Sequence, residues 1–249
     1  MKCCFLLFVC LVISSILPAQ DISILIKEAA RLENNLDEKA ALEKYKEIFK
    51  LQPHNITALN KCSELCSRVG KREAVKLSRI SYYKNAKNYA VAALAVQPNN
   101  SEANCVMAIA LGCVALDASS KEKVNSARDI KKFADKAIYY DPMNFKAWHV
   151  LGRWHYEVSG LNIFEQAAIK IIFGGLPQSS LRQAIEAFEK ANNIKPFAAN
   201  YFEMARAYRR NGERDKAIAT LNALLKLPNG TADDELLKKE GRLLLEKWK

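Results

Sequence analysis

The stretch that decides the fold runs from Trp148 to Pro196 and reads WHVLGRWHYEVSGLNIFEQAAIKIIFGGLPQSSLRQAIEAFEKANNIKP. Both of its ends follow a helical spacing in which small residues alternate with large apolar ones. Small residues allow two antiparallel helices to approach closely, and large ones fill the space beside them. Proline ends the second helix because it lacks an amide hydrogen and clashes with the preceding turn. The stretch therefore predicts a helical hairpin with the key positions Trp148, Leu151, Gly152 and His155, followed by Ala184, Phe188, Ala191 and Pro196.

The second half of this pattern recurs along the chain. Four further copies are Ala41-Tyr45-Ile48-Pro53, Ala86-Ala90-Ala93-Pro98, Ile130-Ala134-Ala137-Pro142 and Ala217-Leu221-Leu224-Pro228. Successive prolines lie 45, 44, 54 and 32 residues apart, whereas an ordinary helical-hairpin repeat has about 34 residues. The second, third and fourth units therefore carry extra sequence between their helices.

This spacing resembles the tetratricopeptide signature, in which a Trp-x2-Leu-Gly-x2-Tyr helix precedes an Ala-x3-Phe-x2-Ala-x4-Pro helix. We therefore predict an all-α fold, a tetratricopeptide-type α-solenoid of about five antiparallel helix pairs with a C-terminal capping helix. The array is expected over residues 21–230 and the cap over residues 231–249. The expected repeats are 22–54, 55–99, 100–143, 144–197 and 198–229, with an insertion at 157–179.

The first twenty residues differ from the rest of the chain. Lys2 precedes an apolar run from Cys3 to Leu17, and Pro18, Ala19 and Gln20 follow as a cleavage region. This pattern predicts a secretory signal peptide over residues 1–20 and a periplasmic or extracellular protein. The alternative is an uncleaved N-terminal anchor. Removing residues 1–19 would lower the net charge from +11 to +10.

The segment from Trp148 also indicates a particular family. It resembles the regulator of microtubule dynamics family, specifically over residues 146–210 and as architecture over residues 22–230. The residues that carry this resemblance are Trp148, Leu151, Gly152, Arg153, Trp154, Tyr156, Pro177, Ala184, Phe188, Ala191 and Pro196. The resemblance implies a helical binding protein linked to microtubules and, in some members, to organelle membranes. Because the leader resembles bacterial ones, we carry over the fold and the binding role, and not the microtubule.

The first helices of such arrays line a concave groove, where ligands usually bind. Counting along the motif from Trp148 places seven residues on this inner face: Lys146, His149, Arg153, Tyr156, Phe202, Arg206 and Arg209. Arginine forks suit carboxylates, and aromatic rings add apolar contact. We therefore expect a non-catalytic scaffold or adaptor whose basic groove binds an acidic protein segment or a peptide C-terminus. The alternative is a solvated basic face without a ligand.

The insertion at residues 157–179 is unusually apolar. It suggests a second function, contact with a membrane surface, in which nearby lysines would meet anionic headgroups. The competing interpretation, which we favour from sequence, is that Ile169, Ile172 and Phe173 pack on neighbouring helices. The insertion could also occlude the groove. A basic stretch from Lys71 to Lys87 would suit nucleic acid by charge alone, but predicted export argues against that partner.

No catalytic or cofactor motif is recognisable in the sequence. There is no nucleophile elbow, phosphate loop or His-Glu-x-x-His helix, so we expect no enzyme activity and no cofactor. No Cys-x-x-Cys pair is present, and no histidine has metal-ligand spacing from a cysteine, so we also expect no metal. Four cysteines follow the leader, namely Cys62, Cys66, Cys105 and Cys113. Buried thiols are our interpretation, although the sequence leaves their disulfide state open.

Overall fold

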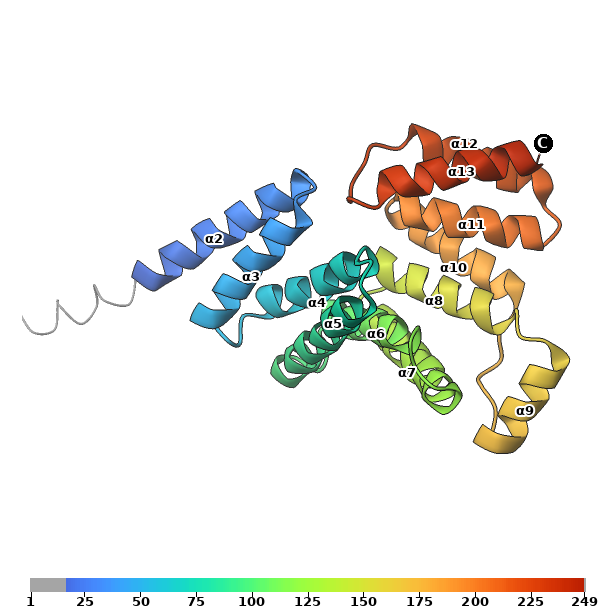
Figure 1. Cartoon of the computed structure of the whole chain (residues 1–249), viewed down its shortest axis with the longest axis horizontal. Coiled ribbons are helices and arrows are strands. Elements are labelled where there is room, and N and C mark those ends of the chain that lie inside the picture. Colours follow the sequence, from blue (N-terminus) through green and yellow to red (C-terminus); the bar gives the residue numbers. More distant parts are fainter. Residues whose placement is uncertain (1–16, 249) are drawn as a thin grey trace, which may run out of the picture.

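The computed structural model describes residues 17–248, and this part of the chain is built from helices without strands (Figure 1). Ten of these helices form five successive antiparallel pairs. The pairs are α2 (Leu17–Asn34) with α3 (Glu38–Leu51), α4 (Ile56–Lys71) with α5 (Lys76–Val96), α6 (Ser101–Ala115) with α7 (Ser120–Tyr140), α8 (Phe145–Val158) with α10 (Leu181–Ile194), and α11 (Ala198–Arg210) with α12 (Arg214–Lys226). Helix α9 (Ile163–Phe173) lies between α8 and α10, and α13 (Asp234–Trp248) follows the last pair. The predicted all-α solenoid is therefore confirmed.

Asparagine caps set the starts of several first helices. Asn55, Asn100 and Asn144 each accept a hydrogen bond from the backbone amide three residues later, at 3.0, 2.9 and 3.0 Å. An N-cap side chain satisfies one of the amides that a helix start leaves without a partner. Each cap follows a repeat-ending proline by two residues, so the end of one pair and the start of the next are encoded together.

The core lies between the paired helices and holds the small residues of the repeated pattern. Ala184 and Ala191 are fully buried, as are Ala86, Ala90 and Ala93. The extra sequence of the second and third units lengthens α5 and α7 to 21 residues each, compared with 14 for α3. These units therefore keep the same hairpin and only extend its second helix.

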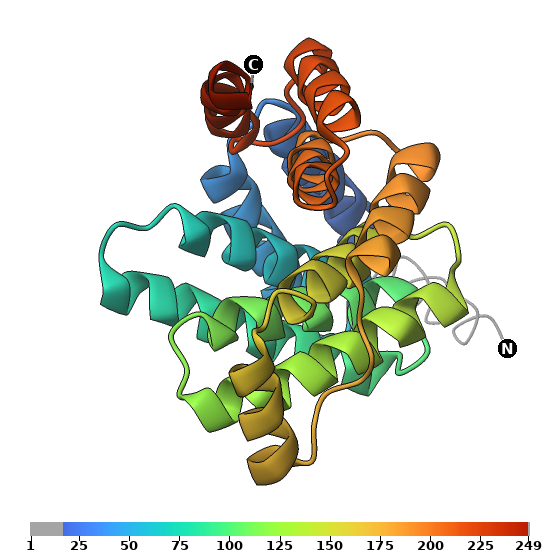
Figure 2. The same cartoon turned by 90° about the vertical axis from the view of Figure 1, so that its right-hand side faces the viewer.

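The array curves far enough for its two ends to touch (Figure 2). Arg72, which follows α4, donates hydrogen bonds to Glu38 at 2.5 Å and to Asp233 at 3.0 Å. Glu38 also accepts one from the backbone amide of Ala232 at 3.3 Å. Glu38 begins α3, whereas residues 232 and 233 lie in the loop before α13. We call this contact the clasp.

The insertion corrects one expectation. Helix α9 has no buried residue, and Ile172 is 67% exposed. It projects from the body of the array beside α7 (Figures 1 and 2). The interpretation that the insertion packs as core is therefore wrong for Ile172, whereas Ile169 and Phe173 are half-buried. The reason is that the α8–α10 hairpin closes directly, with Phe188 against Gly152, and leaves no space for a third helix.

Helix α13 covers the last pair, as expected of a cap. Leu237 and Leu245 are buried against α11 and α12, but Leu236 and Leu243 are 56% and 58% exposed. At the other end, α2 begins at Leu17, before the predicted cleavage positions. The remainder of the predicted signal peptide, residues 1–16, lies outside the described residues. Between residues 17 and 248 no helix combines the length and apolar character needed to cross a membrane.

Candidate functional site

The inner face of the solenoid carries a chain of ion pairs that joins different repeats. Lys146 on α8 pairs with Glu64 on α4 at 3.2 Å and also with Glu102 on α6. Lys61 on α4 pairs with Glu33 on α2 at 2.8 Å. These contacts link residues that are 28 to 82 positions apart in the chain. They therefore hold successive first helices together across the groove.

Burial and pairing act in opposite directions on Glu64. Burial alone would raise its pKa, but Lys146, Arg68 and Lys61 outweigh burial and lower the pKa to about 2. Burial likewise opposes the charge of Lys146, and Glu64 and Glu102 overcome it and raise the pKa of Lys146. Both partners are therefore charged at neutral pH, as expected of a buried ion pair whose charges compensate.

The expectation of a basic groove needs correction. Glu203, next to predicted groove residues, pairs with Arg206 at 2.8 Å and with Arg153 at 3.8 Å. Five basic and six acidic residues take part in the ion pairs of the inner face, so their charges sum to −1. They are Lys61, Arg68, Lys146, Arg153 and Arg206 with Glu33, Glu38, Glu64, Glu102, Glu157 and Glu203. The acids come from other repeats or from other turns of the same helix, and they neutralise the basic residues.

His149 was predicted as a ligand-binding residue of the groove, but aromatic rings hold it instead. Its ring packs against Phe188 and Phe197, with centroid distances of 5.7 and 5.1 Å. Burial, followed by the charge of Arg153, lowers its pKa to about 3, so the imidazole is neutral. Its Nδ1 lies 3.1 Å from Oδ1 of Asn200, whose amide nitrogen donates to the carbonyl of Phe188 at 2.8 Å. Nδ1 therefore carries the hydrogen and donates it, and His149 locks two repeats together.

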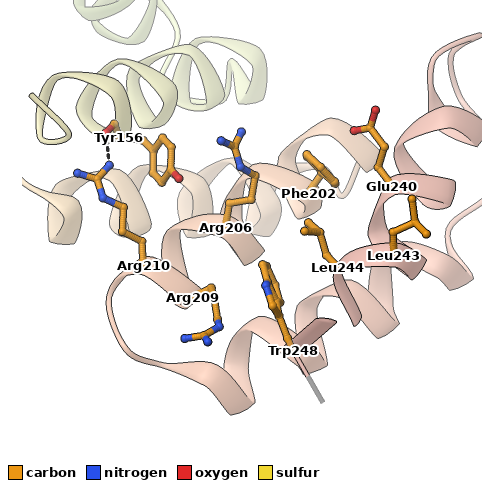
Figure 3. A pocket seen from close by; sticks show the side chains of 9 residues that line it. All are labelled: Tyr156, Phe202, Arg206, Arg209, Arg210, Glu240, Leu243, Leu244 and Trp248. Carbon is orange, nitrogen blue, oxygen red and sulfur yellow. Dashed lines mark hydrogen bonds between the residues drawn. The ribbon is translucent and has the colours of Figure 1, made fainter. Parts of the chain in front are cut away.

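The remaining predicted residues meet in a pocket near the C-terminus (Figure 3). It has a volume of about 580 Å³ and lies between α8, α11 and α13. We call it the C-terminal pocket. Its lining residues are Tyr156, Phe202, Arg206, Arg209, Arg210, Glu240, Leu243, Leu244 and Trp248.

Three arginines, one glutamate (Glu240) and several aromatic side chains define the chemistry of this pocket. Arg206 and Arg210 lie on the ring of Tyr156, at 5.2 and 5.0 Å from its centroid. Arg210 donates to the backbone carbonyls of Tyr156 and Ser159 at 2.9 and 2.8 Å, so its position is held by α8. Arg209 lies 6.0 Å from the centroid of Trp248. Figure 3 shows Trp248 rising from α13 toward Phe202 and Leu244, which leaves an apolar floor beside the cations.

Four of the seven residues predicted for the inner face, Tyr156, Phe202, Arg206 and Arg209, line this pocket. The structure separates the other three, because Lys146 and Arg153 take part in ion pairs and His149 packs on aromatic rings. Sequence reasoning missed the contribution of α13, above all Trp248. A tryptophan near the end of a capping helix is expected to pack on the preceding helix pair, so the sequence did indicate a structural role for Trp248. The spacing of residues did not show which side chains Trp248 would contact.

Outside the C-terminal pocket, the described part of the chain has a second pocket of similar volume, about 560 Å³, which is lined by residues 52–57. Among residues 17–248, no cluster of three or more His, Cys, Asp and Glu side chains could hold a metal ion. The four cysteines are free, and Cys62, Cys66 and Cys105 are buried. Burial raises the pKa of Cys66 to about 11, so its reactive thiolate is scarce at neutral pH. His155 is buried as expected, but its Nδ1 has no hydrogen-bond partner among the described residues.

Comparison with known proteins gives matches over most of the chain. A family described as regulator of microtubule dynamics protein 1-3 matches residues 25–249. Regulator of microtubule dynamics protein 3 of Rattus norvegicus is 28% identical over 162 residues, which cover 64% of this chain and 34% of that protein. Regulator of microtubule dynamics protein 1 of Caenorhabditis elegans is 26% identical over 162 residues, which cover 65% of this chain and 72% of that protein. The chain thus matches only about a third of the rat protein's length.

Solved structures match the fold. The crystal structure of TTC0263, a thermophilic TPR protein of Thermus thermophilus, has a TM-score of 0.67 and 13% sequence identity. That match covers 89% of this chain and 99% of the Thermus protein. PilF of Pseudomonas aeruginosa has a TM-score of 0.54 and 13% identity, covering 93% of this chain and 90% of that chain. These two structures support the tetratricopeptide-type arrangement.

Proposed function

This chain belongs to the regulator of microtubule dynamics family, and we propose that it is a non-catalytic scaffold that binds a protein segment in the C-terminal pocket. Solenoids of stacked helix pairs use their extended concave surfaces for binding. The observation that carries the proposal is the pairing of an apolar floor with arginines in one pocket of about 580 Å³. The geometry of the pocket gives no reason to assign a catalytic role to a residue that lines it.

The pocket suits a carboxylate that lies next to a large apolar side chain. Phe202, Leu244 and Trp248 offer the apolar contact, and Arg206 and Arg209 supply cations at its edge. Arg206 is already paired with Glu203, so Arg209 is the arginine we assign to the ligand carboxylate. An arginine fork binds carboxylates with defined geometry. The partner is therefore an acidic segment or a peptide C-terminus, in keeping with the sequence-based hypothesis but moved from the whole groove to one pocket.

Selection from a displayed library of random peptides tests this proposal. We expect enrichment of sequences that combine an acidic residue or a free C-terminus with a neighbouring aromatic or aliphatic residue. Fluorescence anisotropy with a selected peptide should then show that Arg209→Glu weakens binding by about a hundredfold, because a charge-assisted contact becomes a repulsion. Arg182→Glu is the matched control, since the Arg182 side chain is 88% exposed on α10.

The proposal predicts equal affinity for the control and the unchanged chain. Equal affinity for the Arg209→Glu variant would contradict the pocket as the site. A Trp248→Ala variant should lose binding as well, because the apolar floor disappears, whereas Leu236→Ala on the exposed side of α13 should not.

We also propose the compartment in which this chain meets its partner. The names of the relatives refer to microtubule dynamics. Because residues 1–20 carry a signal-like pattern, we propose that this chain instead meets its partner outside the cytoplasm. Mass spectrometry of the protein recovered from a native culture should find a mature N-terminus at Gln20 or Asp21, and an intact leader on cytoplasmic protein would contradict export.

A further inference from the structure

Helix α9 turns an apolar side toward solvent. At about 100° per residue, six of its residues fall on one side of the helix, which we call the apolar arc: Ile163, Phe164, Ala167, Ala168, Ile171 and Ile172. Ile163, Phe164 and Ile171 are 82%, 87% and 83% exposed. Apolar side chains so far from the core are costly to leave in water, so the apolar arc marks an interaction surface.

The helix is nevertheless held in place. Arg128 on α7 donates hydrogen bonds to the backbone carbonyls of Phe173 and Gly175 at the end of α9. Its Nε donates to the carbonyl of Gly175 as well, at 3.1 Å. At the other end, Asn162 and Glu165 form a capping box. The exposed arc is thus presented by a helix with both ends fixed, rather than by a loose loop.

The surroundings favour an anionic bilayer over a protein partner. Helix α7, on which α9 packs, holds six basic and three acidic residues, for a net charge of +3. Its exposed lysines are Lys121, Lys123, Lys132 and Lys136. The arc has only six residues, whereas a stable protein interface takes about 20 to 30 residues from each side. A bilayer sets no such minimum, because binding there scales with the apolar area inserted and with attraction to anionic lipids.

We propose that the apolar arc of α9 inserts into the surface of an anionic membrane, with the lysines of α7 at the headgroups. Eleven residues span about 16 Å, roughly half of the ~30 Å hydrocarbon core. Helix α9 therefore lies in the interface and does not cross it. This inference goes beyond the proposed function, since the C-terminal pocket and α9 are built from different residues.

Vesicle partitioning of the full chain tests the proposal. The vesicles contain phosphatidylcholine alone or phosphatidylcholine and phosphatidylserine in equal parts. The double substitution Phe164→Ser with Ile171→Ser should weaken binding to the mixed vesicles by about a hundredfold, roughly tenfold for each large side chain kept out of the bilayer. The matched control is Leu77→Ser with Leu116→Ser, which removes two apolar side chains that are 79% and 65% exposed elsewhere.

A local measurement separates α9 from the apolar segment at residues 3–17, which every variant carries. Brominated lipids should quench the fluorescence of a Phe164→Trp variant strongly, and that of a Leu77→Trp variant no more than the unchanged chain. Reversing Lys121 and Lys123 to glutamate should reduce the preference for phosphatidylserine by about tenfold.

Two results would overturn the proposal. One is the absence of additional quenching for Phe164→Trp on phosphatidylserine vesicles. The other is a concentration-dependent dimer in solution that Phe164→Ser with Ile171→Ser abolishes, while the same double substitution leaves binding to the mixed vesicles unchanged. The second result would assign the apolar arc to a contact between copies of the chain.

Discussion

The contact between Gly152 and Phe188 shows how single residues set the helix spacing. A methyl group built on Gly152 would come within 2.6 Å of the Phe188 ring, and Phe188 is fully buried. Neither backbone nor ring has free space to yield in a close-packed interior. The tetratricopeptide glycine is therefore required here by the close approach of α8 and α10.

Gly152→Ala should destabilise the protein by about 1–3 kcal/mol, because it overpacks the α8–α10 hairpin. Gly112→Ala on α6 is the matched control, since its added methyl group would meet Ile130 at an ordinary 3.9 Å. The control should be neutral or stabilising by up to about 1 kcal/mol, as alanine favours a helix over glycine. Urea denaturation of both variants measures the difference, and equal effects would contradict the packing argument.

Glu64 supports a prediction about pH. Its pKa falls from 4.5 to about 2 in the folded chain. A carboxylate with a lowered folded pKa stabilises the protein fully above pH 4.5, and this contribution is lost as the pH falls toward 2. Glu64→Gln should therefore reduce the free energy of unfolding at pH 7 by roughly 2–3 kcal/mol, and the deficit should shrink between pH 4.5 and 2.

Denaturant unfolding at a series of pH values checks this behaviour. Glu186→Gln serves as control, because Glu186 is 53% exposed in its pair with Arg182 and exposed pairs contribute only about 0–1 kcal/mol. A deficit for Glu64→Gln that stays constant down to pH 2 would show that burial, and not the charge of Glu64, accounts for the loss.

At the scale of elements, α9 depends on a side chain from another helix. Gly174 and Gly175 end it with φ values of 75° and 86°, a conformation that glycine adopts without strain. Their amides donate to the carbonyls of Lys170 and Ile169 at 3.0 and 3.1 Å. Arg128 then holds the carbonyls of this turn. The turn itself is formed by residues that are close in sequence, whereas Arg128 on α7 fixes where the end of α9 lies.

Arg128→Ala should therefore release the end of α9. We expect the amides of Gly174 and Gly175 to exchange hydrogen about tenfold faster, since the loss of such hydrogen bonds lowers the local opening free energy by about 1 kcal/mol or more. Hydrogen exchange read by mass spectrometry over residues 165–180 measures this. Arg182→Ala, which removes an exposed arginine, should leave the exchange unchanged; similar acceleration in both variants would argue against the clamp.

At the scale of the whole molecule, the clasp joins the first repeat to the last loop. Glu38 is only 3% exposed, and it accepts from both Arg72 and the amide of Ala232. Arg72→Ala should open the superhelix, increase the radius of gyration seen by X-ray scattering, and cost about 1–3 kcal/mol, because the buried carboxylate of Glu38 loses its shortest ion pair and keeps only Arg68 and the Ala232 amide. Lys39→Ala, at a 67% exposed side chain nearby, is the control. An unchanged radius would show that curvature of the array alone brings the ends together.

What the sequence determined by itself is the set of helix pairs and their contacts within a pair. Alanine and glycine spacing, repeat-ending prolines and asparagine caps act over one or two helical turns, so they can be read from the letters alone. Five pairs and the cap α13 were predicted from the residue spacing and the prolines.

Only the tertiary structure decided which charges meet and which apolar residues stay exposed. Glu64 neutralises Lys146 across 82 positions, Trp248 completes a pocket begun on α8, and α9 lies outside the core. These outcomes depend on the curvature of the array, which accumulates from small rotations between repeats. No local pattern encodes that sum, and so the basic groove expected from sequence became a nearly neutral face with one cationic pocket.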